Sequence, residues 1–232
     1  IKLNLSKMMN NKKKSVLTLT KGVEFLFKKN KIIHLKGKGS ILDRNTVIVT
    51  DDSGKKTSYK TKNIVIGTGS TPASLPEIKI DEKIIVSSTG ALSFEKPPKK
   101  LIVIGGGYIG LELSSVWKRL GSNVTVVEYL DHIIPGMDAD ISKELASIFS
   151  KRKIKILTNK KVEKVEKLKN SVKLLIDSKE IKADIVLVAV GVTGNINNIG
   201  LEKISIKSDN QGRIPVDNKF QTSVKNKTKE RR

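Results

Sequence analysis

Three glycines, Gly105, Gly107 and Gly110, follow directly after an apolar run at residues 101–104. In a strand–turn–helix setting each of them has a physical task. The first permits a sharp turn, the second lets a phosphate approach the backbone where a Cβ would block it, and the third lets the helix lie close on the strand. The helix N-terminus adds free N–H groups and a partial positive charge. This spacing therefore predicts a site for the pyrophosphate of a dinucleotide.

An acidic residue, Glu128, stands where the next apolar run ends, directly after residues 123–127. A carboxylate at the end of the second strand can accept hydrogen bonds from both hydroxyls of a ribose. It would also repel a 2′-phosphate. The sequence therefore predicts binding of NAD rather than NADP.

The flanking elements fit this interpretation. Residues 101–104 are all apolar, which is typical of a strand buried on both faces. Gly121 ends a helix whose apolar residues recur at helical spacing, namely Ile109, Leu113, Val116 and Leu120. Two alternatives stay open: the glycines serve only a tight turn in an ordinary βαβ unit, and Glu112 only complements the helix dipole.

Strands and helices alternate along the rest of the chain. Before the motif we expect a helix capped by Thr20, followed by a meander with strands at 32–35, 40–42 and 46–50. After the meander we expect a strand at 62–66, a small-residue turn at 67–72 and an irregular link at 73–98. After the motif we expect a helix from Asp138 or Asp140, then strand 154–157, a hairpin of 162–168 and 171–176, buried strand 184–190 and short strand 212–217. Gly191 follows the buried strand, at the kind of strand end where open α/β sheets bind ligands.

The charge of the chain is strongly positive, with 45 Lys and Arg against 23 Asp and Glu and a net charge of +22. Such a balance raises the hypothesis of nucleic-acid binding. The lysines are spread along the whole sequence, however, and aromatic residues that could stack on bases make up only 4%. We therefore expect a solvated lysine-rich surface and no specific binding of nucleic acid.

The chain contains no cysteine, which excludes a disulfide framework, a thiolate metal site and a redox dithiol within these residues. Its two histidines, His34 and His132, lie far apart in the sequence and have no ligand-like neighbours. We expect no metal site. No apolar run is long enough to span a membrane and no secretory signal is evident, so we expect a cytoplasmic protein without membrane contact.

Several segments, in order along residues 17–224, resemble the FAD- and NAD-dependent pyridine nucleotide–disulfide oxidoreductases, and within that family the dihydrolipoyl dehydrogenases. The segments that carry the resemblance are residues 19–24, 36–39, 63–72, 103–113, 116–121, 124–128, 188–191 and 212–222.

The resemblance implies an α/β fold in which a Rossmann-like NAD-binding domain is inserted in an incomplete FAD-binding domain with a β-meander. It divides the chain into a partial FAD-binding domain at 1–98, the NAD-binding domain at 99–195, a return to the FAD-binding domain at 196–224 and a disordered basic tail at 225–232.

The site residues that the resemblance implies fall into two sets. Those matching NAD contacts are Gly105, Gly106, Gly107, Tyr108, Ile109, Gly110, Leu111, Glu112, Glu128, Val162 and Gly191. Those matching FAD contacts are Gly39, Thr68, Gly69 and Ser70. Glu112 is similar to the family glutamate that faces the nicotinamide, and Val162 corresponds to a position near the adenine. The sequence departs from the family at 191–195, where Arg and Pro more often follow the glycine, and at Gly67, which replaces an alanine.

The resemblance also shows what these residues lack. Family members begin with a separate FAD-binding βαβ unit and a redox cysteine pair, and they end in a dimerisation domain with a His–Glu base. We therefore expect no catalytic residue in this chain and weak or absent FAD binding. It would be a catalytically incomplete part of an enzyme that converts dihydrolipoamide and NAD⁺ to lipoamide and NADH.

Alternatives are an NAD-binding module without catalysis and another reductase of the same family. The partners implied are a second copy of the family protein, a 2-oxoacid dehydrogenase complex and a complementary chain that supplies the missing parts.

Overall fold

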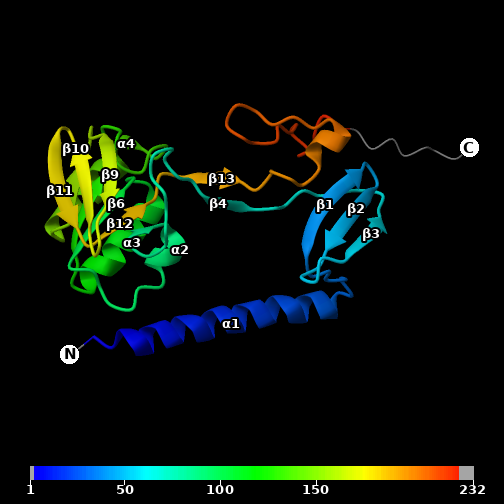
Figure 1. Ribbon diagram of the computed structural model, residues 1–232, viewed down its shortest axis with the longest axis horizontal. Coiled ribbons are helices and arrows are strands. Elements are labelled where there is room, and N and C mark those ends of the chain that lie inside the picture. Colours follow the sequence, from blue (N-terminus) through cyan, green and yellow to red (C-terminus); the bar gives the residue numbers. More distant parts are fainter. Residues whose placement is uncertain (1–2, 225–232) are drawn as a thin grey trace, which may run out of the picture. The chain divides into compact units, whose positions relative to one another are not determined.

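The computed structural model describes residues 3–224 and divides the chain into two compact units (Figure 1). Unit 1 contains the residues up to Lys14 together with Pro72–Val192. Unit 2 contains Ser15–Thr71 together with the residues from Thr193 onward. The expected tail at 225–232 lies outside the described residues.

Unit 1 is built on a five-stranded sheet whose strands all run parallel. The strand order is β5 (Ile85–Val86), β12 (Ile185–Val188), β6 (Lys100–Ile104), β7 (Asn123–Val127) and β8 (Lys155–Leu157). The central strand β6 pairs with β12 on one side and with β7 on the other, so that Leu101 lies opposite both Ile185 and Val124. From β6 the chain continues through β7 to β8 on one side of β6, and it later returns to the other side as β12, so the order of strands reverses between β6 and β12.

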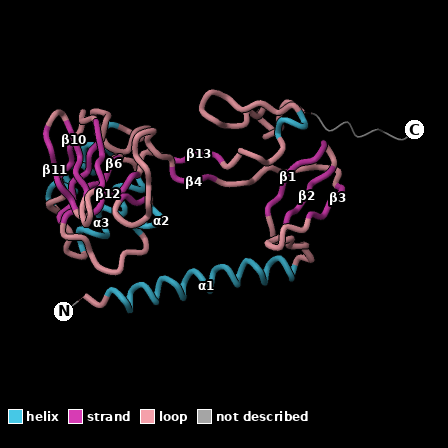
Figure 2. Tube along the Cα trace, in the orientation of Figure 1, coloured by secondary structure: helices cyan, strands magenta, loops and turns pink. Residues whose placement is uncertain are grey.

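Two further layers cover the faces of this sheet (Figure 2). On one face lie the helices α2 (Ser88–Ala91), α3 (Tyr108–Arg119) and α4 (Ala139–Lys151). On the other lies an antiparallel sheet of β9 (Val162–Lys167), β10 (Val172–Ile176) and β11 (Lys179–Ala183). Of the two expected helix starts, Asp138 and Asp140, the structure has Asp138 as the N-cap of α4, and its carboxylate accepts a hydrogen bond from the Asp140 N–H.

Strand β6 shows why its sequence is wholly apolar. Leu101 and Val103 pack in the cluster that contains the helices, while Ile102 and Ile104 pack in the cluster that contains the antiparallel sheet. Successive side chains of a strand point to opposite faces, so both faces of β6 are buried. The predicted strand at 101–104 is therefore confirmed.

Residues 73–98 differ from the expected irregular link, because they supply part of unit 1. They contribute the edge strand β5 and the helix α2. Phe94 packs on Trp117 with ring centroids 4.8 Å apart, and the Trp117 indole N–H donates to the Ala91 carbonyl oxygen at 3.1 Å. A strand of two residues is too short to leave a periodic signal in the sequence, which explains the difference.

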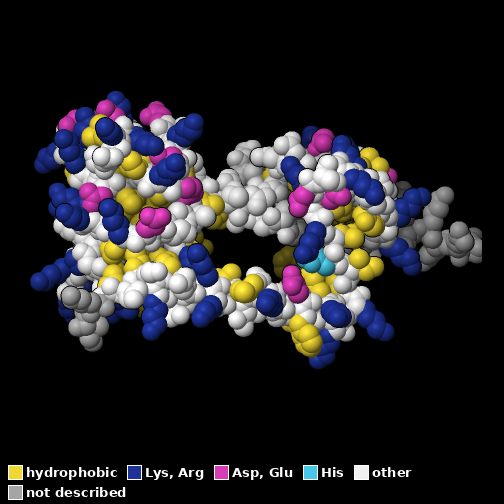
Figure 3. Space-filling model, turned by 60° about the horizontal axis from the view of Figure 1, so that its bottom comes forward, with side chains coloured by type: hydrophobic (Ala, Val, Ile, Leu, Met, Phe, Trp, Pro, Cys, Tyr) yellow, Lys and Arg dark blue, Asp and Glu magenta, His cyan; other side chains and the backbone are white. Residues whose placement is uncertain are grey.

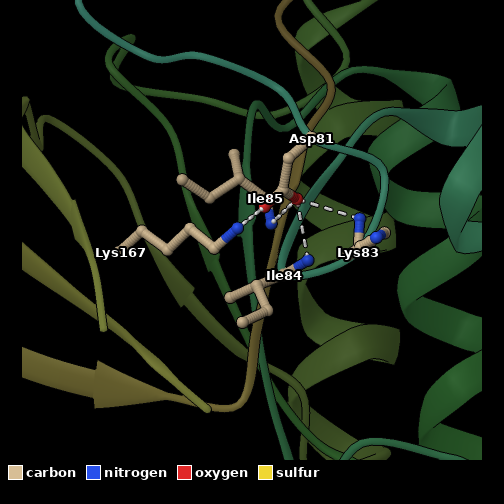
Figure 4. A network of polar contacts seen from close by, with 5 residues as sticks. All are labelled: Asp81, Lys83, Ile84, Ile85 and Lys167. Carbon is tan, nitrogen blue, oxygen red and sulfur yellow. Dashed lines mark hydrogen bonds and ion pairs between the residues drawn. The ribbon is translucent and has the colours of Figure 1, made fainter. Parts of the chain in front are cut away.

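The turn before β5 is organised by one carboxylate, Asp81 (Figure 4). One of its oxygens accepts hydrogen bonds from the backbone N–H groups of Lys83, Ile84 and Ile85, and the other pairs with the Lys167 ammonium on β9. Burial acts to raise the pKa of Asp81, but the Lys167 ammonium and the backbone donors outweigh it and hold this pKa well below its ordinary range.

Unit 2 contains a three-stranded antiparallel meander and a small core. The meander consists of β1 (Lys38–Asp43), β2 (Thr46–Thr50) and β3 (Lys56–Lys60). The short helix η1 (Leu201–Ile204) packs against β1, and the Ile41 N–H donates to the Ile199 carbonyl oxygen at 2.7 Å. The strands predicted at 40–42 and 46–50 are confirmed.

Three other strands predicted in this part of the chain are wrong, since residues 32–35, 62–66 and 212–217 form no strand. The apolar pattern is present, but no neighbouring strand pairs with these segments. As a result Ile33 is 83% exposed and Val65 is 93% exposed.

The short strands β4 (Ser70–Pro72) and β13 (Val192–Gly194) pair as a two-stranded sheet.

The first helix, α1 (Leu5–Lys29), begins much earlier than the predicted cap at Thr20. Thr20 lies inside the helix, where its hydroxyl donates to the Leu17 carbonyl oxygen at 3.0 Å. The lysines before it favour a helix by intrinsic propensity but give no apolar periodicity. No helix in residues 3–224 has the length and apolar character that a membrane crossing needs.

Positive side chains are distributed over both units (Figure 3). On the face shown, Lys and Arg are mixed with Asp and Glu and form no single stripe. This distribution agrees with the expected solvated lysine-rich surface.

Candidate dinucleotide-binding site

A pocket of about 790 Å³ opens at the edge of unit 1 where the carboxyl ends of the parallel strands meet. Residues that follow β6, β7, β8 and β12 all contribute to its wall. Because the chain order reverses between β6 and β12, this edge contains the position where doubly wound sheets bind their ligands.

The glycine turn after β6 has the geometry that the sequence predicts. Gly105 has a φ of +108°, and a Cβ on it would lie 2.3 Å from the Ala189 carbonyl oxygen. A Cβ on Gly110 would lie 2.3 Å from the Gly105 carbonyl oxygen and 3.1 Å from a Val103 methyl group. The sharp turn and the close approach of helix to strand are therefore confirmed as structural roles of these two glycines.

Gly107 differs from its neighbours because nothing lies within 4 Å of the place where its Cβ would be. It is the N-cap of α3, with φ −73° and ψ 174°, and no side chain caps this helix end. The N–H groups of the first helical turn have no partner within the helix, and the turn contains no acidic residue. The open space over Gly107 therefore faces a helix end that attracts an anion.

Glu128 lies directly after β7, with only 8% of its surface exposed. Its Oε2 accepts a hydrogen bond from the Gly106 N–H at 2.5 Å, and its Oε1 accepts one from the Leu130 N–H at 2.8 Å. Each carboxylate oxygen can accept more than one hydrogen bond, so the group can still accept from a ribose hydroxyl. A 2′-phosphate is mostly doubly ionised at neutral pH, so the Glu128 carboxylate would repel it.

The structure brings most of the predicted NAD residues to the pocket. Those in its wall are Gly105, Gly107, Tyr108, Ile109, Glu128, Val162 and Gly191. Four predicted residues are not in the wall. Gly106 bonds to Glu128, Gly110 faces β6, Leu111 is buried in the core, and Glu112 is exposed on α3.

Other wall residues were not predicted from the sequence. They include Leu75, Tyr129, Leu130, Met137, Lys160 and Lys161. Tyr129 and Leu130 follow β7, and the two lysines follow β8, so the rule that ligands bind at the ends of parallel strands would have found them. Leu75 and Met137 lie on loops and leave no such signal.

The residues predicted to contact FAD lie in unit 2, and two of them, Thr68 and Gly69, are bonded to Asn195. Its side-chain amide donates to the Thr68 carbonyl oxygen at 3.1 Å, and its backbone N–H donates to the Gly69 carbonyl oxygen at 3.0 Å. Gly69 has a φ of +71°, Ser70 begins β4, and Gly39 lies on β1. No group of three His, Cys, Asp or Glu residues suited to a metal ion occurs within residues 3–224.

The sheet order, the glycine turn and the acidic residue after the second strand together define a Rossmann-like dinucleotide-binding fold. The comparison with protein families agrees. A model described as pyridine nucleotide-disulphide oxidoreductase matches residues 3–226, and the chain belongs to this family. Its members are FAD- and NAD-dependent oxidoreductases.

Curated relatives point to one branch of the family. The chain is 49% identical to dihydrolipoamide dehydrogenase of Chaetomium thermophilum over 231 residues, which cover 97% of this chain and 46% of that protein. It is 46% identical to mitochondrial dihydrolipoyl dehydrogenase 1 of Arabidopsis thaliana, covering 97% of this chain and 45% of that one. The chain thus spans about half the length of these relatives.

Solved structures share the same arrangement. LpdA of Mycobacterium tuberculosis superposes with a TM-score of 0.90 over 96% of this chain and 50% of its own, at 23% identity, which shows the fold alone. A mutant of the flavoprotein disulfide reductase RclA of Escherichia coli, in its Cu(II) complex, gives a TM-score of 0.86 at 26% identity over 95% of this chain and 50% of its own.

The relatives also correct one expectation. The predicted cytoplasmic location is wrong, because the dihydrolipoyl dehydrogenases of Arabidopsis thaliana, Pisum sativum and Bos taurus that match this chain are all mitochondrial by name.

Proposed function

We propose that this chain binds NAD in the pocket of unit 1. The observation that carries the proposal is the open space over Gly107, at the uncapped N-terminus of α3, with Glu128 across the same pocket. A pocket of about 790 Å³ is within the range of sites for small molecules and cofactors.

Each part of the pocket has a proposed contact. The free N–H groups at the start of α3 would donate to the pyrophosphate, and Glu128 would accept from the hydroxyls of the adenosine ribose. Val162 would lie against the adenine, and Gly191 would lie near the nicotinamide half. The domain assignment of 99–195 to NAD binding and of 1–98 and 196–224 to FAD binding belongs to this proposal.

The identity to dihydrolipoyl dehydrogenases supports a proposed activity for the enzyme to which these residues correspond. It is the oxidation of dihydrolipoamide by NAD⁺, for which bound FAD would supply hydride transfer. In this chain Gly39, Thr68, Gly69 and Ser70 would provide part of the flavin wall, so FAD binding by these residues alone is weak or absent. Partners proposed on the same ground are a second copy, a 2-oxoacid dehydrogenase complex and a complementary chain.

The 232 residues contain no cysteine and therefore cannot form the redox disulfide that this activity needs. We expect the purified chain to give no NADH from dihydrolipoamide and NAD⁺. Turnover by the purified chain would contradict this.

Two measurements separate the proposal from its alternative, an NAD-binding module without any flavin chemistry. Competition of ADP-ribose with NADH, followed by NADH fluorescence, tests the dinucleotide site. An absorbance spectrum after incubation with FAD and gel filtration tests the flavin site. Bound yellow flavin that NADH bleaches supports a working half-reaction, whereas colourless protein that binds NADH supports the module.

A further inference from the structure

The carboxylate of Glu128 connects two loops of the pocket. Its Oε2 accepts from Gly106, in the glycine turn, and its Oε1 accepts from Leu130, in the loop after β7. The same two loops are joined a second time, because the Ile134 N–H donates to the Gly106 carbonyl oxygen at 2.8 Å. Both polar groups of the Gly106 backbone are therefore bonded to the segment that follows β7.

These bonds hold a charged group that has no cationic partner within the described residues. Glu128 is buried, and both of its oxygens face backbone N–H dipoles instead. Hydrogen bonds from N–H groups to a buried carboxylate are stronger than those between neutral groups. Loss of the bond from the buried Gly106 N–H would leave a buried donor without an acceptor.

We propose that Glu128 is a positioning residue, which holds the glycine turn in its phosphate-binding shape before any dinucleotide arrives. This role is separate from acceptance of ribose hydroxyls, and it rests on the proposed NAD site. The proposal also says which backbone N–H groups remain free to bind the pyrophosphate. The Gly106 N–H is used by the protein, so the pyrophosphate is bound by the N–H groups of the first turn of α3, from Tyr108 onward.

The first test needs no ligand. Amide hydrogen exchange is measured on the full ligand-free chain, for peptides that cover residues 104–110 and 128–135, in wild type and in Glu128→Gln. The glutamine keeps the size of the side chain but has one acceptor oxygen and one NH₂ group, so at least one of the two loop amides loses its acceptor. We expect exchange at Gly106 or Leu130 to be about tenfold faster or more.

Two further variants control this comparison. Glu144→Gln removes the same charge from an exposed position on α4, outside the pocket, and should leave exchange in both peptides unchanged. Glu128→Asp keeps the charge but shortens the reach to the loops, and should also raise exchange. Exchange in the β6 peptide reports whether the fold itself is intact in each variant. Unchanged exchange at both Gly106 and Leu130 in Glu128→Gln and Glu128→Asp would overturn the proposal.

The second test uses NADH and an NADH analogue without the adenosine ribose hydroxyls. If Glu128 positions the turn, Glu128→Gln weakens not only NADH but also the analogue, by about tenfold, although the analogue offers no ribose hydroxyl to residue 128. Loss confined to NADH would show that Glu128 acts on the ribose alone and would overturn the positioning role. Failure of the wild-type chain to bind NADH would refute the proposed function, while the exchange experiment would still decide the role of Glu128.

Discussion

Gly107 and Gly110 both lie at the start of α3, but the space available for a side chain differs between them. A Cβ on Gly110 would lie 2.3 Å from a backbone oxygen, whereas a Cβ on Gly107 would meet nothing within 4 Å. Gly110→Ala should therefore destabilise unit 1 by about 1–3 kcal/mol through overpacking. Gly107→Ala should change the free energy of unfolding by about 1 kcal/mol or less, yet weaken NADH at least about tenfold, because the methyl group occupies the place of the phosphate.

Thermal unfolding and NADH titration of the two variants check this pair of expectations. Gly22→Ala is the matched control, since Gly22 lies on α1 with nothing within 4 Å of its Cβ position and takes no part in the pocket. It should leave NADH affinity unchanged. Full NADH affinity in Gly107→Ala would show that the phosphate does not approach this residue.

At the scale of elements, Asp81 connects the turn before β5 to strand β9. The pKa of its carboxyl group is lower in the folded chain than the ordinary 3.8, so its contribution to stability is present above about pH 4 and is lost as the pH falls further. Asp81→Asn should cost about 1–2 kcal/mol at pH 7, and the difference from wild type should shrink below about pH 4.

Urea unfolding from pH 7 down to pH 3 measures this difference. Lys167→Gln is the useful comparison, because it removes the ion pair but keeps the three backbone hydrogen bonds to Asp81, and it should cost less than half as much. Equal stability of Asp81→Asn and wild type at pH 7 would contradict the role given to this turn.

The elements also show what the sequence could and could not predict. Strand β6, helix α3 and strand β7 were predictable, because an apolar run, a glycine turn and helical spacing coincide in one segment. The strand predicted at 62–66 has the right pattern, but a strand needs a neighbour, and sequence pattern alone does not supply one. Gly105 and Gly107 of the pocket wall were predictable from their spacing, whereas Leu75 and Met137 enter the wall through loops that carry no periodic signal.

At the scale of the whole molecule, the compact unit is larger than the NAD-binding segment that the sequence indicates. Residues 72–98 add Val86, Ala91 and Phe94 to the core around Trp117. A chain of residues 72–192 should therefore unfold cooperatively, and a chain of residues 99–195 should melt at least about 10 °C lower. Circular dichroism melts of both chains measure this. Equal melting temperatures would show that β5 and α2 add nothing to the fold.

Unit 2 exposes large apolar side chains on its surface. Ile33, Val65 and Phe220 are all more than 80% exposed. Exposed apolar groups of this kind favour association. The full chain should therefore aggregate at lower concentration than residues 72–192, which light scattering measures. Equal or better solubility of the full chain would contradict this expectation.

The central claim is that unit 1 binds NAD and discriminates against NADP. Titration of the 232-residue chain with NADH and with NADPH, followed by nucleotide fluorescence, tests it most directly. The structure predicts saturable binding of NADH and at least about tenfold weaker binding of NADPH, since the buried carboxylate of Glu128 would face the 2′-phosphate. Absence of NADH binding, or equal binding of the two nucleotides, would contradict the account.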